Sequence, residues 1–124
     1  MTSVLVVDGA NVVGSKPDGW WKDRAGAARR LHERLAVADT SYDVIVLVLE
    51  GAAKGGVPAG RDGHLRTVHA ARDGDAASVS AVAEATGRGD DVVAITADRG
   101  LSMRVEASGG RVMSPSWLID LVGY

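Results

Sequence analysis

Three stretches rich in β-branched apolar residues divide the chain, at residues 4–7, 43–49 and 91–95. Runs of this length and composition are typical of strands buried on both faces of a parallel sheet. Two shorter strands are predicted at residues 65–69 and 111–113. The first run ends in Asp8-Gly9, a turn signal that predicts a change of chain direction, and residues 14–21 are predicted to form a loop.

Between the strands, apolar residues recur at three- and four-residue steps, which predicts helices. The clearest spans residues 24–38, where Ala28, Leu31 and Leu35 share a face and Asp23 is placed to cap the amino end. Further helices are predicted over residues 75–87, 99–107 and 116–121. Residues 51–63 are rich in glycine and are predicted to be a long loop through which no helix runs.

Strands that alternate with helices imply right-handed crossovers. We therefore expect an α/β fold: a three-layer, Rossmann-like domain with a mainly parallel five-stranded sheet. A length of 124 residues fits a single domain, residues 1–124.

Composition narrows the functional classes. The chain has no cysteine, which excludes disulfides, thiolate metal sites and a cysteine nucleophile. It has no basic leader and no long apolar run, so we expect a cytoplasmic protein that does not contact a membrane. The net charge is −2, but eleven of the fourteen basic residues are arginine, the residue best suited to bidentate phosphate contacts.

Acidic residues follow each of the three long strands: Asp8, Glu50 and, after Thr96-Ala97, Asp98. Because the carboxyl ends of parallel strands lie along one edge, these carboxylates should converge, and Asp75 at the start of a helix can join them. A plain helix-capping role for Asp75 is the alternative. Crowded carboxylates repel unless a cation holds them, and Mg²⁺ or Mn²⁺ prefers such all-oxygen sites.

Ions of this kind support phosphodiester hydrolysis without a protein general base. This matters because His32, His64 and His69 have no spacing typical of a relay or zinc site. Thr96 is expected to hydrogen-bond a carboxylate at the same edge and to lie against the substrate. The candidates for phosphate contacts are Lys16, Arg29, Arg30 and Arg99, with a solvated helix face as the alternative for the arginines of the first helix. The pair Trp20-Trp21 either stacks on bases or closes the edge of the core.

The motifs V-V-D-G-A-N at the amino end and T-A-D-R-G-L at residues 96–101 resemble those of the PIN-like NYN ribonucleases, in particular the YacP-like branch. The resemblance covers nearly the whole chain. It implies an RNA-cleaving enzyme, with endonuclease as the expected mode, that uses Mg²⁺ or Mn²⁺. The residues that match the group's acidic site are Asp8, Asn11, Glu50, Asp75 and Asp98, and Asn11 would orient a ligand or substrate phosphate.

The chain departs from the pattern of this group at two positions. Relatives often carry a second acid beside the one that matches Asp75, whereas this chain has Ala76 there and Asp73 nearby. Glu50 stands where Asp is frequent. A non-catalytic module that binds RNA or protein and keeps the fold is therefore the alternative, and the sequence leaves open whether the chain forms a homodimer.

Other acidic α/β families lack support in the sequence. A phospho-aspartate phosphatase would need a second acid at position 10, which is Ala10. A receiver domain would need a lysine after its last strand, and no lysine follows Lys54. The phosphate-binding motif G-x-x-x-x-G-K-[ST] is absent.

Overall fold

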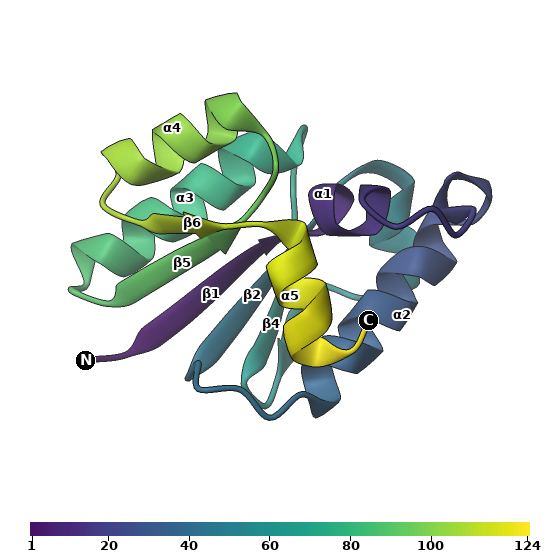
Figure 1. Cartoon of the computed structure of the whole chain (residues 1–124), viewed down its shortest axis with the longest axis horizontal. Coiled ribbons are helices and arrows are strands. Elements are labelled where there is room, and N and C mark those ends of the chain that lie inside the picture. Colours follow the sequence, from purple (N-terminus) through teal and green to yellow (C-terminus); the bar gives the residue numbers. More distant parts are fainter.

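A computed structural model describes residues 1–124 and contains one sheet of six strands, in the order β3-β4-β2-β1-β5-β6 (Figure 1). The strands are β1 (Ser3–Asp8), β2 (Val44–Leu49), β3 (Gly60–Asp62), β4 (Leu65–His69), β5 (Asp91–Ile95) and β6 (Arg111–Met113). Every neighbouring pair is parallel except β3 and β4, which are antiparallel. The predicted α/β fold with a mainly parallel sheet is confirmed, and the predicted number of strands is corrected from five to six.

Five α-helices and two 3₁₀ helices connect the strands. The α-helices are α1 (Gly9–Gly14), α2 (Arg24–Val37), α3 (Gly74–Gly87), α4 (Arg99–Ala107) and α5 (Pro115–Val122), and the 3₁₀ helices are η1 (Trp20–Lys22) and η2 (Gly51–Gly56). The predictions of α2, with Asp23 as its cap, and of α3, α4 and α5 are confirmed within one residue at every end. None of these helices combines the length and apolar character needed to cross a membrane.

Two local predictions are wrong. Helix α1 begins directly after β1, where a turn was expected, because Asp8 caps the helix and the chain enters it without a loop. The predicted loop over residues 51–63 holds η2 and the edge strand β3. Both elements contact other segments of the chain: β3 pairs with β4, and Lys54 in η2 donates a hydrogen bond to the carbonyl of Ala70 over 3.0 Å.

Helices cover both faces of the sheet (Figure 1), and an apolar layer lies on each face. One lies between the sheet and α1, α2 and α5, and it contains Leu5 and Val7 of β1. The other lies under α3 and α4 and contains Val4 and Val6. This alternation follows from the two-residue period of a strand. A residue at the end of a strand therefore lies on the same side of the sheet as the residue two positions before it.

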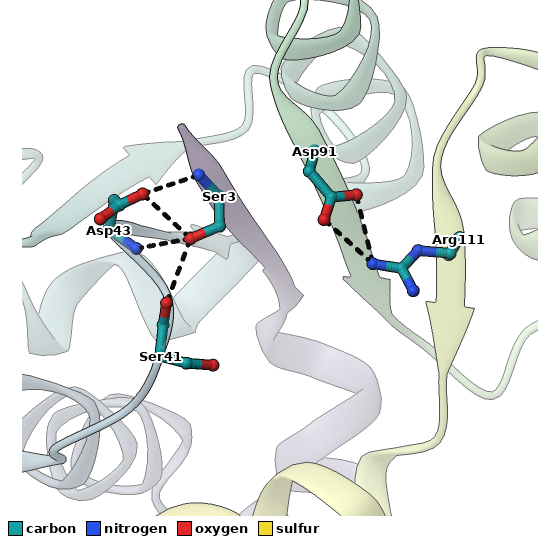
Figure 2. Close-up of polar contacts among 5 residues, drawn as sticks. All are labelled: Ser3, Ser41, Asp43, Asp91 and Arg111. Atoms are coloured by element: carbon teal, nitrogen blue, oxygen red, sulfur yellow. Dashed lines mark hydrogen bonds and ion pairs between the residues drawn. The ribbon is translucent and has the colours of Figure 1, made fainter. Parts of the chain in front are cut away.

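At the amino edge of the sheet, opposite the candidate site, polar contacts tie neighbouring strands together (Figure 2). The Asp43 carboxylate accepts hydrogen bonds from the Ser3 backbone N–H over 2.8 Å and from the Ser3 hydroxyl over 3.1 Å. Arg111 of β6 pairs with Asp91 of β5 at 3.2 Å. These contacts join β1 to the chain before β2, and β5 to β6.

Candidate functional site

The site lies at the carboxyl ends of β1, β2 and β5. Asp8 and Thr96 continue the positions of β1 and β5 that face α3 and α4, and Glu50 does the same for β2. After β1 the chain passes to the α1–α2 face, and after β5 it passes to the α4 face, so the crevice between these neighbouring strands is a topological switch point. In open α/β sheets, ligands bind in such crevices.

Asp8 is the most buried carboxylate of the site, with 3% of its surface exposed. Its Oδ1 accepts a hydrogen bond from the backbone N–H of Asn11, which caps α1, and its Oδ2 accepts one from the Asn11 side-chain amide over 2.6 Å. Burial raises the pKa of Asp8, the bonds from Asn11 oppose the rise, and the charges of Asp75 and Glu50 add to it. The carboxylate is thus held in place by a neutral donor but has no cationic partner.

Asn11 also connects the two sides of the crevice. Its Oδ1 accepts a hydrogen bond from the backbone N–H of Ala97, in the turn after β5, over 3.2 Å. One amide group therefore orients Asp8 and fixes the chain that leads to Asp98. This explains the D-G-x-N spacing, because a capping residue and the residue three positions later face each other in the first turn of a helix.

Thr96 and Asp98 shape the turn between β5 and α4. Thr96 is buried, and its hydroxyl accepts a hydrogen bond from the backbone N–H of Asp98 over 3.1 Å. The expectation that Thr96 bonds a carboxylate is corrected, since it binds the backbone of the acidic residue instead. Asp98 caps α4 by accepting from Leu101 N–H over 2.8 Å, while its side chain stays exposed at the edge.

Glu50 lies between β2 and the start of α3. Its Oε2 accepts a hydrogen bond from the backbone N–H of Gly74 over 3.0 Å. A β-carbon placed on Gly74 would be 3.4 Å from Glu50 Oε1 and 3.7 Å from Asp8 Oδ1. The two carboxylates therefore border the same small space, and a residue without a side chain keeps that space open.

Asp75 lies in the first turn of α3, and the residue that caps this helix is Asp73, which accepts from Ala76 N–H over 3.0 Å. The capping alternative for Asp75 is therefore wrong, and its carboxylate makes no hydrogen bond. Partial burial raises the pKa of Asp75, and the charges of Asp98, Asp73 and Glu50 raise it further, against a smaller opposing effect of Arg104. Ser78 lies one helical turn after Gly74 on the buried face of α3, and its hydroxyl has no hydrogen-bond partner.

The four predicted acids thus lie at one edge and influence one another electrostatically. In the side-chain positions of the structure, however, no three acidic or histidine side chains are close enough to hold one metal ion. The donor set fits Mg²⁺ or Mn²⁺ by its chemistry, since it offers only oxygens and has uncompensated negative charge. Two of the carboxylates, those of Asp8 and Asp98, also cap helices, and each does so through its Oδ1.

The predicted phosphate contacts are more dispersed. Arg99 is the first residue of α4, directly after Asp98, and Arg29 is exposed on α2. Lys16 and Arg30 line a different depression, formed by α2 and the carboxyl terminus, where the Lys16 ammonium lies 4.5 Å from the ring centre of Tyr124. The structure does not bring Lys16 and Arg30 to the acidic residues.

The histidines have structural contacts. His64 and His69 are hydrogen-bonded through Nε2 to the carbonyls of Leu35 and Val57, at 2.9 and 2.7 Å. His32 is half-buried on α2.

The two tryptophans lie in different surroundings, and only Trp20 is at the edge of the core, while the stacking role stays a prediction. Trp20 packs against the core, and Trp21 is 56% exposed. Trp20 also lines a cavity beside Glu50, together with Arg24 and Arg72, two residues that the sequence patterns did not single out.

No family model matches the chain, and no curated protein matches it either. Among solved structures, the crystal structure of a single-residue mutant of Rae1 (YacP) from Bacillus subtilis superposes with a TM-score of 0.77 at 16% sequence identity. The match covers 98% of this chain and 76% of that one. The chain therefore has the YacP-like fold.

Proposed function

We propose that this protein is a metal-dependent ribonuclease of the PIN-like NYN group that hydrolyses RNA phosphodiester bonds at the carboxyl edge of its sheet. The observation that carries the proposal is the pairing of Asp8, a buried carboxylate with no cationic partner, with Glu50 around the open space at Gly74. The resemblance of the two sequence motifs to YacP-like ribonucleases and the YacP-like fold support it from independent directions.

Asp8, Glu50, Asp75 and Asp98 would hold the ion. Bound Mg²⁺ or Mn²⁺ supplies a water of lowered pKa and neutralises negative charge on the phosphate. Asn11 would orient Asp8 by donating to it, a bond that lowers the pKa of Asp8 against the larger effect of burial, and the Thr96 hydroxyl would hold the turn that presents Asp98. Arg99, at the start of α4 beside Asp98, would contact a phosphate of the RNA.

The test is cleavage of labelled single-stranded and structured RNAs with Mn²⁺, with Mg²⁺ and with EDTA. The Asp8→Asn variant is assayed beside the wild type to expose contaminating nuclease. We expect cleavage by the wild type that requires the metal and is lost in Asp8→Asn, while RNA binding is retained. The positions of the cuts, internal or terminal, distinguish an endonuclease from an exonuclease.

The second candidate is a non-catalytic RNA-binding module. Two observations favour it: Ala76 stands where relatives often carry an acid, and no three side chains are already placed to share an ion. Folded wild-type protein that binds RNA but cleaves none of these substrates with either metal would establish this alternative over the enzyme.

A further inference from the structure

A cavity of about 350 Å³ lies next to the acidic edge, on the face of the sheet covered by α1 and α2. Its volume is within the range of small-ligand sites. The floor is apolar and is made by Val13, Ala28 and Leu49. Glu50 forms part of its wall while its carboxylate accepts the hydrogen bond from Gly74, so the cavity and the acidic edge share this residue.

One wall of the cavity is aromatic. Trp20 lines it and is half-buried against the core, which holds the ring in place, and Trp21 contacts its edge from outside the cavity with ring centres 5.9 Å apart. The guanidinium of Arg24 lies 5.2 Å from the centre of the Trp20 ring. The guanidinium lies over the indole, so a flat aromatic ring that stacks on this face would take the place of Arg24 and leave it to contact a phosphate.

The rim of the cavity is cationic. Arg24 and Arg72 both line it, both are exposed, and neither takes part in a salt bridge. Guanidinium groups that are outside salt bridges can bind phosphate oxygens in a bidentate way. A ligand that matches this cavity has a flat ring for the apolar floor and a phosphate for the rim, which describes a nucleotide.

We propose that the cavity holds one unpaired base of the RNA, next to the phosphodiester bond at the acidic edge. In this arrangement Trp20 stacks on the base, and Arg24 and Arg72 contact the flanking phosphates. The inference rests on the proposed function, because RNA is taken as the substrate. It adds a specificity: a base that is paired in a duplex cannot enter the cavity, so single-stranded segments are selected.

The test measures binding of a short fluorescein-labelled single-stranded RNA, and of the same strand in a duplex, by fluorescence anisotropy with EDTA present. Trp20→Leu and the double variant Arg24→Gln/Arg72→Gln should each weaken binding of the single strand about tenfold. The matched controls are Trp21→Leu, an exposed tryptophan outside the cavity, and Arg66→Gln on β4, and both should bind like the wild type.

Because Trp20 packs on the core, a second variant removes the cavity without removing a core group. Ala53→Leu adds volume at a lining position of η2 and should weaken binding to a similar degree, with thermal melts confirming that each variant is folded. Equal affinity in the wild type and all cavity variants, a loss as large in Trp21→Leu as in Trp20→Leu, or no binding by the wild type overturns the inference.

The two proposals fail separately. Metal-dependent cleavage that is unchanged by the cavity variants would leave the ribonuclease in place and reject the base site. Binding that follows the expected pattern, from protein that cleaves no RNA with either metal, would keep the base site and reject the ribonuclease.

Discussion

Asn11 donates a hydrogen bond from its side-chain amide to Oδ2 of Asp8 over 2.6 Å, and the same amide accepts from Ala97 N–H on the other side of the crevice. Asp8 is buried and has no cation beside it, so this neutral donor is the main group that favours its charged form. The Asn11–Asp8 pair therefore contributes both to the stability of the fold and to the charge of the site. Exchanging the two residues tests the contribution to stability.

Replacing Asn11 with Asp keeps an oxygen for Ala97 N–H but places a second carboxylate against Asp8. We expect Asn11→Asp to lower the free energy of unfolding at pH 7 by about 1–3 kcal/mol, measured by urea denaturation. The exchanged variant Asp8→Asn/Asn11→Asp restores an amide-carboxylate pair and should recover most of this loss. An exchanged variant no more stable than Asn11→Asp would show that the pairing does not matter for stability.

Gly9 begins α1 where the helix passes over β2. A β-carbon at this position would be 2.7 Å from the backbone carbonyl of Val48, so Gly9→Ala must displace backbone next to Asp8. We expect a loss of about 1–3 kcal/mol in the free energy of unfolding, larger than the gain from removing a helical glycine. Gly14→Ala, at the exposed end of the same helix with no contact closer than 3.8 Å, is the matched control and should be neutral or slightly stabilising.

The positions of the strand-end acids could be predicted from the sequence because strand composition and acid placement are local properties. Asp8, Glu50 and Asp98 each follow an apolar run, and a parallel sheet brings the carboxyl ends of these strands to one edge. The Asn11–Ala97 bond could not be predicted in the same way, since it joins residues 86 positions apart and depends on how β1 and β5 pair.

Other features missed by the sequence patterns depend on tertiary contacts. Strand β3 has no apolar side chain and all three of its residues are exposed, so only its pairing with β4 defines it. The segment Asp73-Gly74-Asp75 offers two candidate caps for α3, and the structure uses the first, with Gly74 bonded to Glu50. The cavity beside Glu50 joins Trp20, Arg24 and Arg72, which no spacing rule connects.

Asp43 provides a pH dependence that is independent of the acidic site. Hydrogen bonds from the Ser3 backbone and side chain lower the pKa of Asp43 below its ordinary value of 3.8. A lowered pKa in the folded state means that the stabilisation is present above the unfolded pKa and is lost as the pH falls through the folded one. The stability difference between wild type and Asp43→Asn should therefore shrink as the pH is lowered below about 4, measured by urea denaturation. Asp39→Asn, which removes an exposed acid that makes no side-chain hydrogen bond, is the control variant.

Ser78 is a buried hydroxyl with no hydrogen-bond partner on the face of α3 that packs on the sheet. Removing an unsatisfied buried polar group should stabilise the protein, and alanine is also the better helix former. We expect Ser78→Ala to raise the free energy of unfolding by about 1–2 kcal/mol. Ser80→Ala, on the exposed side of the same helix, measures the propensity effect alone, and equal gains in both variants would show that the buried hydroxyl carries no cost.

Metal binding at the acidic edge predicts a stabilisation that is separate from catalysis. An ion that binds only the folded protein raises its stability by about 2.7 kcal/mol at a concentration one hundred times its Kd, so Mn²⁺ should raise the Tm and EDTA should reverse the rise. Asp8→Asn removes the most buried carboxylate and should abolish most of this shift, whereas Asp120→Asn, an exposed acid on α5, should keep it. An equal shift in all three proteins would mean that Mn²⁺ binds elsewhere on the surface. A shift confined to proteins that retain Asp8 would place the ion at the edge even before any substrate is known.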